Sequence, residues 1–97
     1  MATYMALIKL TERGVKEIKE TGKRAADLKT HEKKHGIVVK EQYWSMGAYD
    51  GLILFEAPDD ETASAAMLSL TSREHVTTQT LRCFTAAEMS KIVGKIA

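Results

Sequence analysis

The sequence has little cysteine and few aromatic residues. Cys83 is the only cysteine among 97 residues, so the chain cannot form an internal disulfide. A reducing compartment is therefore the simpler location, and we expect a cytoplasmic protein. Aromatic residues make up only 6% of the chain, as one Trp, three Tyr and two Phe, so an aromatic pair in it is notable.

Long hydrophobic runs and an excess of charge are also missing. The 14 basic and 13 acidic residues give a net charge of +1, which offers no field that would attract nucleic acid or an anionic membrane. The apolar run near the N-terminus is too short for a signal sequence or a membrane span. We therefore expect that the partners are neither nucleic acids nor membranes.

Motifs that bind common cofactors are absent as well. The chain has no glycine-rich phosphate loop, no nucleophile elbow and no Cys-x-x-Cys pair, so we expect no cofactor. With 44% hydrophobic residues, residues 1–97 are predicted to form one small domain. Its core would be thin, and oligomerisation is a common remedy for a thin core.

Hydrophobic patterning and turn signals divide the chain into strands and helices. The first helix is expected to begin after the N-cap Thr11 and to pause near Gly22, which weakens a helix. Asp59 is the expected N-cap of another helix, and Thr85 with Glu88 forms a capping box. The expected elements are a strand over 3–10, an interrupted helix over 12–35, strands over 37–46 and 51–57, a helix over 60–70, a strand over 75–84 and a C-terminal amphipathic helix.

This β-α-β-β-α-β order with a terminal helix predicts an α+β protein with the ferredoxin-like fold. Both main helices should cover one face of a four-stranded antiparallel sheet and leave the other face open. The first strand is apolar on both faces: Ala6 and Ile8 fall on one, Met5 and Leu7 on the other. The third strand has the same property. The economical arrangement is a homodimer in which two open faces meet.

The turn between the expected hairpin strands reads Gly47-Ala48-Tyr49-Asp50. It is the Gly-x-Tyr-Asp turn for which the GYD domain family is named, and the chain resembles that family from Tyr4 to about Glu88. Gly22 departs from the family pattern, which often has proline there, and Gly51 stands where a larger apolar residue is usual. The supporting matches are Thr11 with Gly14, Lys23-Arg24-Ala25, and Glu56-Ala57-Pro58-Asp59.

The resemblance implies a fold more firmly than a function. The GYD family is similar in fold to the dimeric α+β barrels, small proteins whose two sheets face each other. Relatives in that superfamily include cofactor-free monooxygenases, isomerases and haem enzymes. The fold therefore raises several functions and selects none, and it leaves open whether this protein is an enzyme.

Tyr49 and Asp50 are the candidate catalytic residues. Glycines on both sides of the pair leave room for a ligand, the carboxylate can act as a general base, and the tyrosine hydroxyl can donate a hydrogen bond. We expect them at the edge of a pocket on the helix-covered side of the sheet. In the alternative, Asp50 bonds backbone amides near its turn and Tyr49 covers the strand end.

Tyr43, Trp44 and His35 are the candidate ligand-binding residues of that pocket. An aromatic pair in a chain this poor in aromatics suits a planar organic ligand, and His35 would reach the rim. His31 and His35 have the H-E-x-x-H spacing of a zinc-binding helix. Lysines stand between them, however, and no third ligand is near in the sequence, so we expect no metal site.

Two classes of function remain. The first is a domain that binds a small aromatic or polar organic molecule, or runs cofactor-free chemistry on it, in a pocket between sheet and helices. The alternative is a non-catalytic sensor or protein-interaction module. A closed apolar cavity with convergent polar groups would favour the first class, and a filled core would favour the second.

Overall fold

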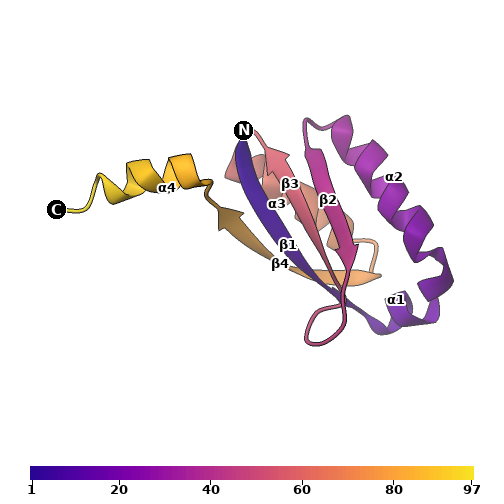
Figure 1. Ribbon diagram of the computed structural model, residues 1–97. Helices are drawn as coiled ribbons and strands as arrows, with labels where there is room; N and C mark the ends of the chain where they lie inside the picture. The colour runs from indigo at the N-terminus through magenta and orange to yellow at the C-terminus, as the bar shows by residue number, and fades with distance from the viewer.

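Four strands form one antiparallel sheet in the computed structural model, which describes all of residues 1–97 (Figure 1). The strands are hydrogen-bonded in the order β2-β3-β1-β4, so β2 and β4 are the edges. This order confirms the α+β class and the ferredoxin-like arrangement. The elements are β1 (Ala2–Leu10), α1 (Glu12–Lys16), the short 3-10 helix η1 (Ile18–Glu20), α2 (Thr21–Lys33), β2 (Val38–Trp44), β3 (Gly51–Ala57), α3 (Asp60–Thr71), β4 (Val76–Cys83) and α4 (Ala86–Val93).

The first helical segment is broken into α1, η1 and α2, as the sequence predicted. Thr11 caps α1, because its hydroxyl oxygen accepts a hydrogen bond from the Gly14 amide at 3.1 Å. Gly14 packs against the chain before β4, where an added Cβ would lie 2.1 Å from the His75 carbonyl oxygen. Helix α2 begins at Thr21, slightly earlier than expected. Gly36 follows its C-terminus with a positive φ of 80°, which favours glycine.

Helices α3 and α4 both begin at side-chain caps that the sequence predicted. At the start of α3, the Asp59 carboxylate accepts a hydrogen bond from the Thr62 amide at 2.7 Å. At the start of α4, Thr85 and Glu88 bond each other's backbone amides in a capping box. The capping box stabilises the first turn of α4 locally, and Glu88 also forms an ion pair with Arg82 of β4 at 3.5 Å.

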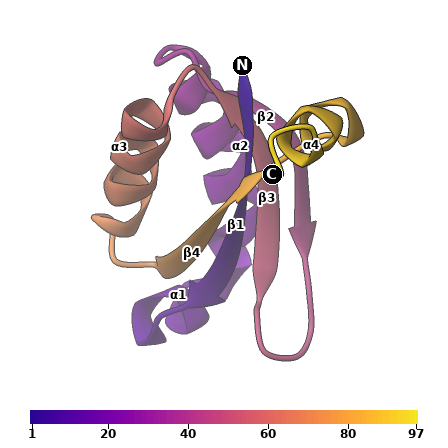
Figure 2. The same ribbon diagram turned by 90° about the vertical axis from the view of Figure 1, so that its left-hand side faces the viewer.

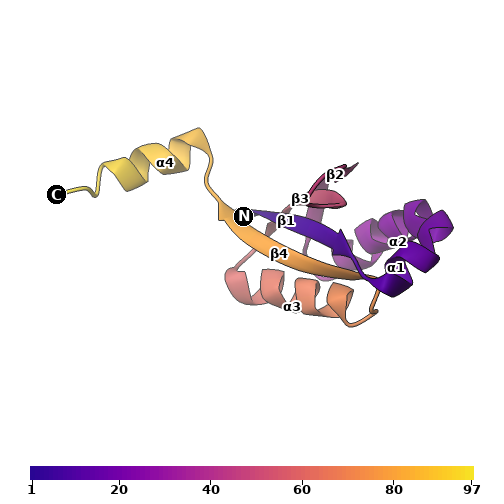
Figure 3. The same ribbon diagram turned by 90° about the horizontal axis from the view of Figure 1, so that it is seen from below.

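The hydrophobic core lies between the sheet and helices α2 and α3, which cover the same face (Figures 1 and 3). Tyr4 of β1 stacks on Phe55 of β3 inside this core, with ring centroids 5.3 Å apart. The buried core residues are Tyr4, Ala6, Ile8, Leu28, Ile37, Val39, Ile53, Phe55, Ala57, Ala63, Ala66 and Met67. Several of them are alanines, so this single core buries little apolar volume.

The opposite face of the sheet carries apolar side chains that no helix covers. Side chains alternate between the two faces along each strand, so Met5 and Leu7 of β1 point away from the core. Met5 is paired with Leu54 of β3 on one side and with Leu81 of β4 on the other, and Leu7 is paired with Leu52. All five are at least partly exposed, and together they define what we call the open face.

Helix α4 extends beyond the end of β4 and away from α2 and α3 (Figures 1 and 2). The sequence predicted an amphipathic helix here, and its apolar residues do recur at helical spacing, but none of its residues is buried. We call Met89, Ile92 and Val93, together with Ile96 just beyond the end of the helix, the α4 stripe. None of the helices of this protein combines the length and the apolar character that a membrane crossing requires.

Candidate functional site

A pocket of about 270 Å³ lies between the sheet and α2. Ile8 of β1 and Ile53 of β3 line it from the sheet, and Leu28 lines it from α2. In all, 10 of the 17 lining residues are hydrophobic, which suits a ligand with an apolar body. We call this the helix-side pocket. It occupies the location between the sheet and the first helix where the sequence predicted one.

Two of the predicted ligand-binding residues, Tyr43 and Trp44, line this pocket from the end of β2. The Trp44 indole Nε1 donates a hydrogen bond to the Thr21 hydroxyl at 3.0 Å, at the start of α2. Gln42 Nε2 likewise donates to the Ala25 carbonyl oxygen at 3.1 Å. These two bonds join the edge strand β2 to α2 and so fix one wall of the pocket.

The Tyr43 hydroxyl donates a hydrogen bond to the Glu41 carboxylate at 3.2 Å. The negative charge of Glu41, and then the hydrogen bond itself, raise the pKa of Tyr43. The phenol therefore stays protonated at neutral pH. Its hydroxyl serves as a donor rather than as a base.

Arg24 and His75 are two of the polar residues in the pocket lining. Arg24 Nη1 donates a hydrogen bond to the Glu17 carbonyl oxygen at 2.9 Å, and His75 Nε2 lies 3.4 Å from Glu17 Oε1. The other guanidinium nitrogen, Arg24 Nη2, and the other ring nitrogen, His75 Nδ1, are buried without any hydrogen-bond partner. No other buried side-chain nitrogen or oxygen atom of the molecule lacks a hydrogen-bond partner, and both residues line the same pocket.

Glu17 holds this polar group together. Its carboxylate accepts a hydrogen bond from Arg13 Nε at 2.9 Å and faces His75 on the other oxygen. The bond from Arg13, and secondarily the one from His75, lower the pKa of Glu17. The sequence did not predict this arrangement, because it depends on the break between α1 and α2 and on the return of the chain before β4. The one sequence signal was Arg24, within a stretch that carries the family resemblance.

The predicted catalytic residue Asp50 lies outside the helix-side pocket. Its carboxylate oxygen Oδ2 accepts a hydrogen bond from the Leu10 backbone amide at 2.8 Å. Its own amide donates to the Ile8 carbonyl oxygen, also at 2.8 Å. These contacts correspond to the alternative in which Asp50 bonds backbone groups, although here the donor belongs to β1 rather than to the turn. A catalytic role for Asp50 stays a prediction.

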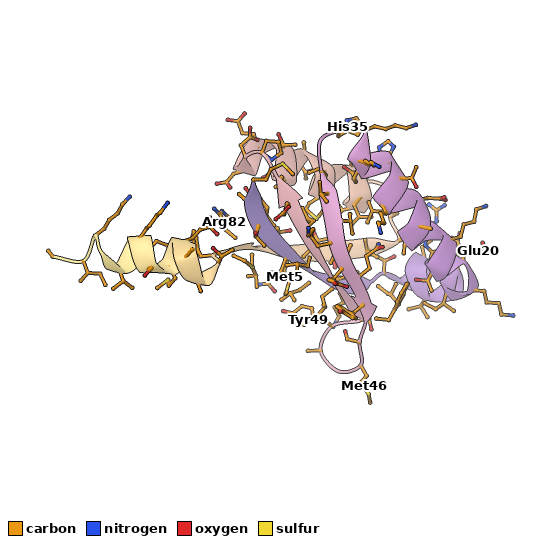
Figure 4. The ribbon with its side chains drawn as sticks, turned by 45° about the horizontal axis from the view of Figure 1, so that its top comes forward. Met5, Glu20, His35, Met46, Tyr49 and Arg82 are labelled. Carbon is orange, nitrogen blue, oxygen red and sulfur yellow. The ribbon has the colours of Figure 1, made fainter.

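Tyr49, its predicted partner, also lies outside this pocket. The Tyr49 hydroxyl donates a hydrogen bond to Gln79 Oε1 at 2.7 Å. Gln79 is paired with Leu7, so Tyr49 contacts the open face rather than the helix-covered face. Figure 4 shows Tyr49 at the base of the β2–β3 loop and Met46 at its tip. The role of Tyr49 as a proton donor to a ligand stays a prediction too.

His35, the third predicted ligand-binding residue, follows the C-terminal end of α2, away from the β2–β3 loop (Figure 4). It does not line the helix-side pocket. Instead it lines a separate hollow between α2 and α3 together with His31, whose ring centroid lies 4.9 Å from its own. No group of three or more His, Cys, Asp or Glu side chains is placed to hold a metal ion.

Comparison with known proteins identifies a relative that is similar over nearly the whole chain. The chain is 33% identical over 90 residues to a protein of Thermus thermophilus named glutamine synthetase and cystathionine beta-lyase binding protein. The alignment covers 92% of this chain and 95% of that relative. Among solved structures there is no significant match.

A family model described as GYD domain matches residues 4–93. This range includes nearly the whole chain and the turn Gly47-Ala48-Tyr49-Asp50, whose Asp50 links the hairpin to β1. Family and relative agree with the resemblance that this turn indicated. The chain therefore belongs to the GYD domain family.

Proposed function

We propose that this protein is a non-catalytic interaction module that binds metabolic enzymes, and that it does so as a homodimer. The relative from Thermus thermophilus is named for binding two enzymes, and its likeness to this chain spans nearly the full length of both. The observation in the structure that carries the proposal is the apolar surface that the chain leaves uncovered, on the open face and on the α4 stripe. The lone Cys83 fits a cytoplasmic location for this role.

The open face is the proposed dimer contact. Met5, Leu7 and Leu54 lie near the middle of a four-stranded sheet, where a monomer leaves them in water. Two sheets pack face to face at about 10 Å, with side chains from both faces interdigitated. A second copy would supply a face of the same size and apolar character, in the arrangement of the dimeric α+β barrels. The second core so formed would compensate for the thin core of each subunit.

The α4 stripe is the proposed contact for the partner enzyme. Met89, Ile92 and Val93 of α4 stand at positions i, i+3 and i+4, and Ile96 follows the helix at i+7; this is the spacing of helices that bind in an apolar groove of another protein. The capping box of Thr85 keeps the helix formed in the free protein. A preformed helix loses less conformational entropy on binding than a disordered segment does.

Binding of the partner can be tested with purified glutamine synthetase and purified cystathionine beta-lyase from the same organism. We expect at least one of them to form a complex with the wild-type protein in sedimentation velocity. Ile92→Glu should weaken this complex strongly, because it places a charge in the α4 stripe. Ser90→Glu adds the same charge outside the stripe and should leave the complex intact. If neither enzyme binds, the proposed function is wrong. If Ile92→Glu binds normally, the contact lies elsewhere on the protein.

A small-molecule role is the second candidate, and the helix-side pocket is the observation that favours it. The pocket has an apolar lining, an aromatic pair and two polar side chains with unpaired atoms. We propose this role as binding in addition to the interaction role. Asp50 and Tyr49 lie outside this pocket, so ligand binding there does not depend on them. Cofactor-free chemistry by these two side chains would require both to leave their present hydrogen bonds.

A further inference from the structure

We propose that the helix-side pocket binds a small hydroxy acid with an apolar body, whose carboxylate is held by Arg24 and whose hydroxyl is held by His75. The inference starts from the two buried polar atoms that lack partners, Arg24 Nη2 and His75 Nδ1. Buried polar groups in native proteins are nearly always paired, and exceptions call for an explanation such as an absent ligand. Both exceptions in this molecule belong to residues that line one pocket.

The charged residues that line the pocket favour a negatively charged ligand. Arg24, Arg73 and His75 are among its lining residues, and Asp27 is the only acidic one. Glu17 lies behind the lining, where its carboxylate is already engaged by Arg13 at 2.9 Å. The planar guanidinium of Arg24 uses Nη1 for the Glu17 carbonyl oxygen, which leaves the Nη2 side of the fork for a carboxylate oxygen. Arg24 Nη2 is covered by protein in the free structure, so the guanidinium must turn to meet the ligand. The half-buried side chain is held by a single hydrogen bond, which permits this movement.

The hydroxyl follows from the way His75 is held. His75 Nε2 faces the Glu17 carboxylate at 3.4 Å, and a carboxylate can only accept. In the neutral ring the proton therefore belongs on Nε2, and Nδ1 becomes an acceptor without a donor. A hydroxyl on the ligand supplies that donor. Arg24 and His75 line the same pocket, and both contact Glu17, Arg24 at its carbonyl oxygen and His75 at its carboxylate, so the proposal places both anchors on one ligand.

The rest of the pocket fixes the size and character of the ligand body. Its volume of about 270 Å³ is at the lower limit of pockets that hold drug-sized molecules, so the ligand has a small ring or a short branched chain. Leu28, Ile53 and Trp44 of the lining offer apolar and aromatic contacts. Trp44 is held in place by its bond to Thr21. It is also the only tryptophan of the chain, so its fluorescence reports on the pocket.

The test uses three matched probes on the full-length protein, with Trp44 fluorescence and calorimetry as readouts. The probe 3-phenyllactate has the carboxylate, the hydroxyl and a ring, 3-phenyllactamide has no negative charge, and 3-phenylpropionate has no hydroxyl. We expect 3-phenyllactate to bind and each of the other two to bind about tenfold more weakly, since each loses one hydrogen-bonded anchor. Equal binding of acid and amide, or no binding of the acid at millimolar concentration, would overturn the proposal.

Variants then assign each anchor to its residue. Arg24→Gln should reduce the preference for acid over amide to less than about twofold, and His75→Phe should remove the preference for 3-phenyllactate over 3-phenylpropionate. Lys29→Gln removes a positive charge from the exposed side of the same helix and should leave both preferences unchanged. If Arg24→Gln retained the full preference for the acid, Arg24 would not be the anchor.

The position of the probe can be checked without any variant. Backbone amide NMR shifts induced by 3-phenyllactate should map to Ala25, Leu28 and Ile53, which line the pocket. Shifts confined to the open face or to α4 would overturn the proposal. The enzyme-binding function is a separate question, because Arg24→Gln leaves α4 unchanged and should still form the complex with the partner enzyme. Failure of one proposal is therefore distinguishable from failure of the other.

Discussion

The carboxylate of Asp50 accepts a hydrogen bond from the backbone amide of Leu10 at 2.8 Å, across 40 positions of sequence. The Asp50 amide donates to the Ile8 carbonyl oxygen at the same distance. Asp50 therefore joins the end of the β2–β3 loop to the end of β1. This link makes the side chain a structural element of the turn that defines the family.

Replacement of Asp50 tests this structural role. Asp50→Ala leaves the Leu10 amide without its partner and should lower the free energy of unfolding by about 1–2 kcal/mol. Asp50→Asn should cost less, because the amide oxygen can still accept the bond. Urea unfolding monitored by circular dichroism measures both. A stable Asp50→Asn protein that no longer binds its ligand or its partner enzyme would instead support a functional role for the charge.

The open face predicts the behaviour of Leu7→Glu and Leu54→Glu. Each places a charge among the apolar side chains of the proposed dimer contact, so each should dissociate the dimer or unfold the protein. Light scattering coupled to size-exclusion chromatography gives the mass. Ala26→Glu on the exposed side of α2 is the matched control and should leave the mass unchanged. A stable wild-type monomer at micromolar concentration would rule out the dimer.

Two helical glycines should respond in opposite ways to the same change. Gly14→Ala places a Cβ 2.1 Å from the His75 carbonyl oxygen, so α1 must move, and we expect a loss of about 2 kcal/mol or more. Gly22→Ala meets no atom within 4 Å and should stabilise α2 by up to about 1 kcal/mol. Chemical denaturation of the two variants provides the comparison. Equal effects would show that Gly14 is not closely packed.

The cap of α3 predicts a pH dependence. Hydrogen bonds from the Thr62 side chain and amide hold the pKa of Asp59 below its ordinary value of 3.8. A lowered pKa in the folded protein means that this stabilisation is present above about pH 4 and is lost as the pH falls through the folded-state pKa. Asp59→Ala should therefore lower the midpoint of thermal unfolding at pH 7 by a few degrees.

The same difference should shrink as the pH is lowered through the folded-state pKa of Asp59, because the wild-type carboxyl then becomes protonated. Thermal melts at several pH values check this. A difference that does not change with pH would mean that Asp59 stabilises α3 through something other than its charge.

Local signals predicted most of the fold. The caps Thr11, Asp59 and Thr85 each accept from the amide three residues away, so a short stretch of sequence is sufficient to indicate them. Alternation along β1 and β3 predicted that both faces of the sheet are apolar, and the structure places Met5 and Leu7 on the open face. These features depend on spacing within one element, which the sequence displays directly.

The polar part of the pocket could not be predicted in this way. Arg24 and His75 are 51 positions apart, and both contact Glu17 only because the helix is broken before α2 and the chain returns before β4. Tyr43 and Trp44 could be predicted as pocket residues, because they end a strand beside the first helix. His35 follows the C-terminal end of α2, whereas the pocket lies nearer the start of that helix. The sequence pattern alone does not show which end of the helix lies beside the pocket.

The separation of α4 from the core has a consequence for how such proteins diverge. Residues 86–97 contribute no buried side chain, so substitutions there scarcely affect folding as long as the capping box is kept. Selection on the fold and selection on this helix therefore act on different residues. If α4 carries the proposed contact with the partner enzyme, closely related domains can change which enzyme they bind by changing a few exposed positions in residues 86–97, while the sheet, its loop and its pocket stay the same.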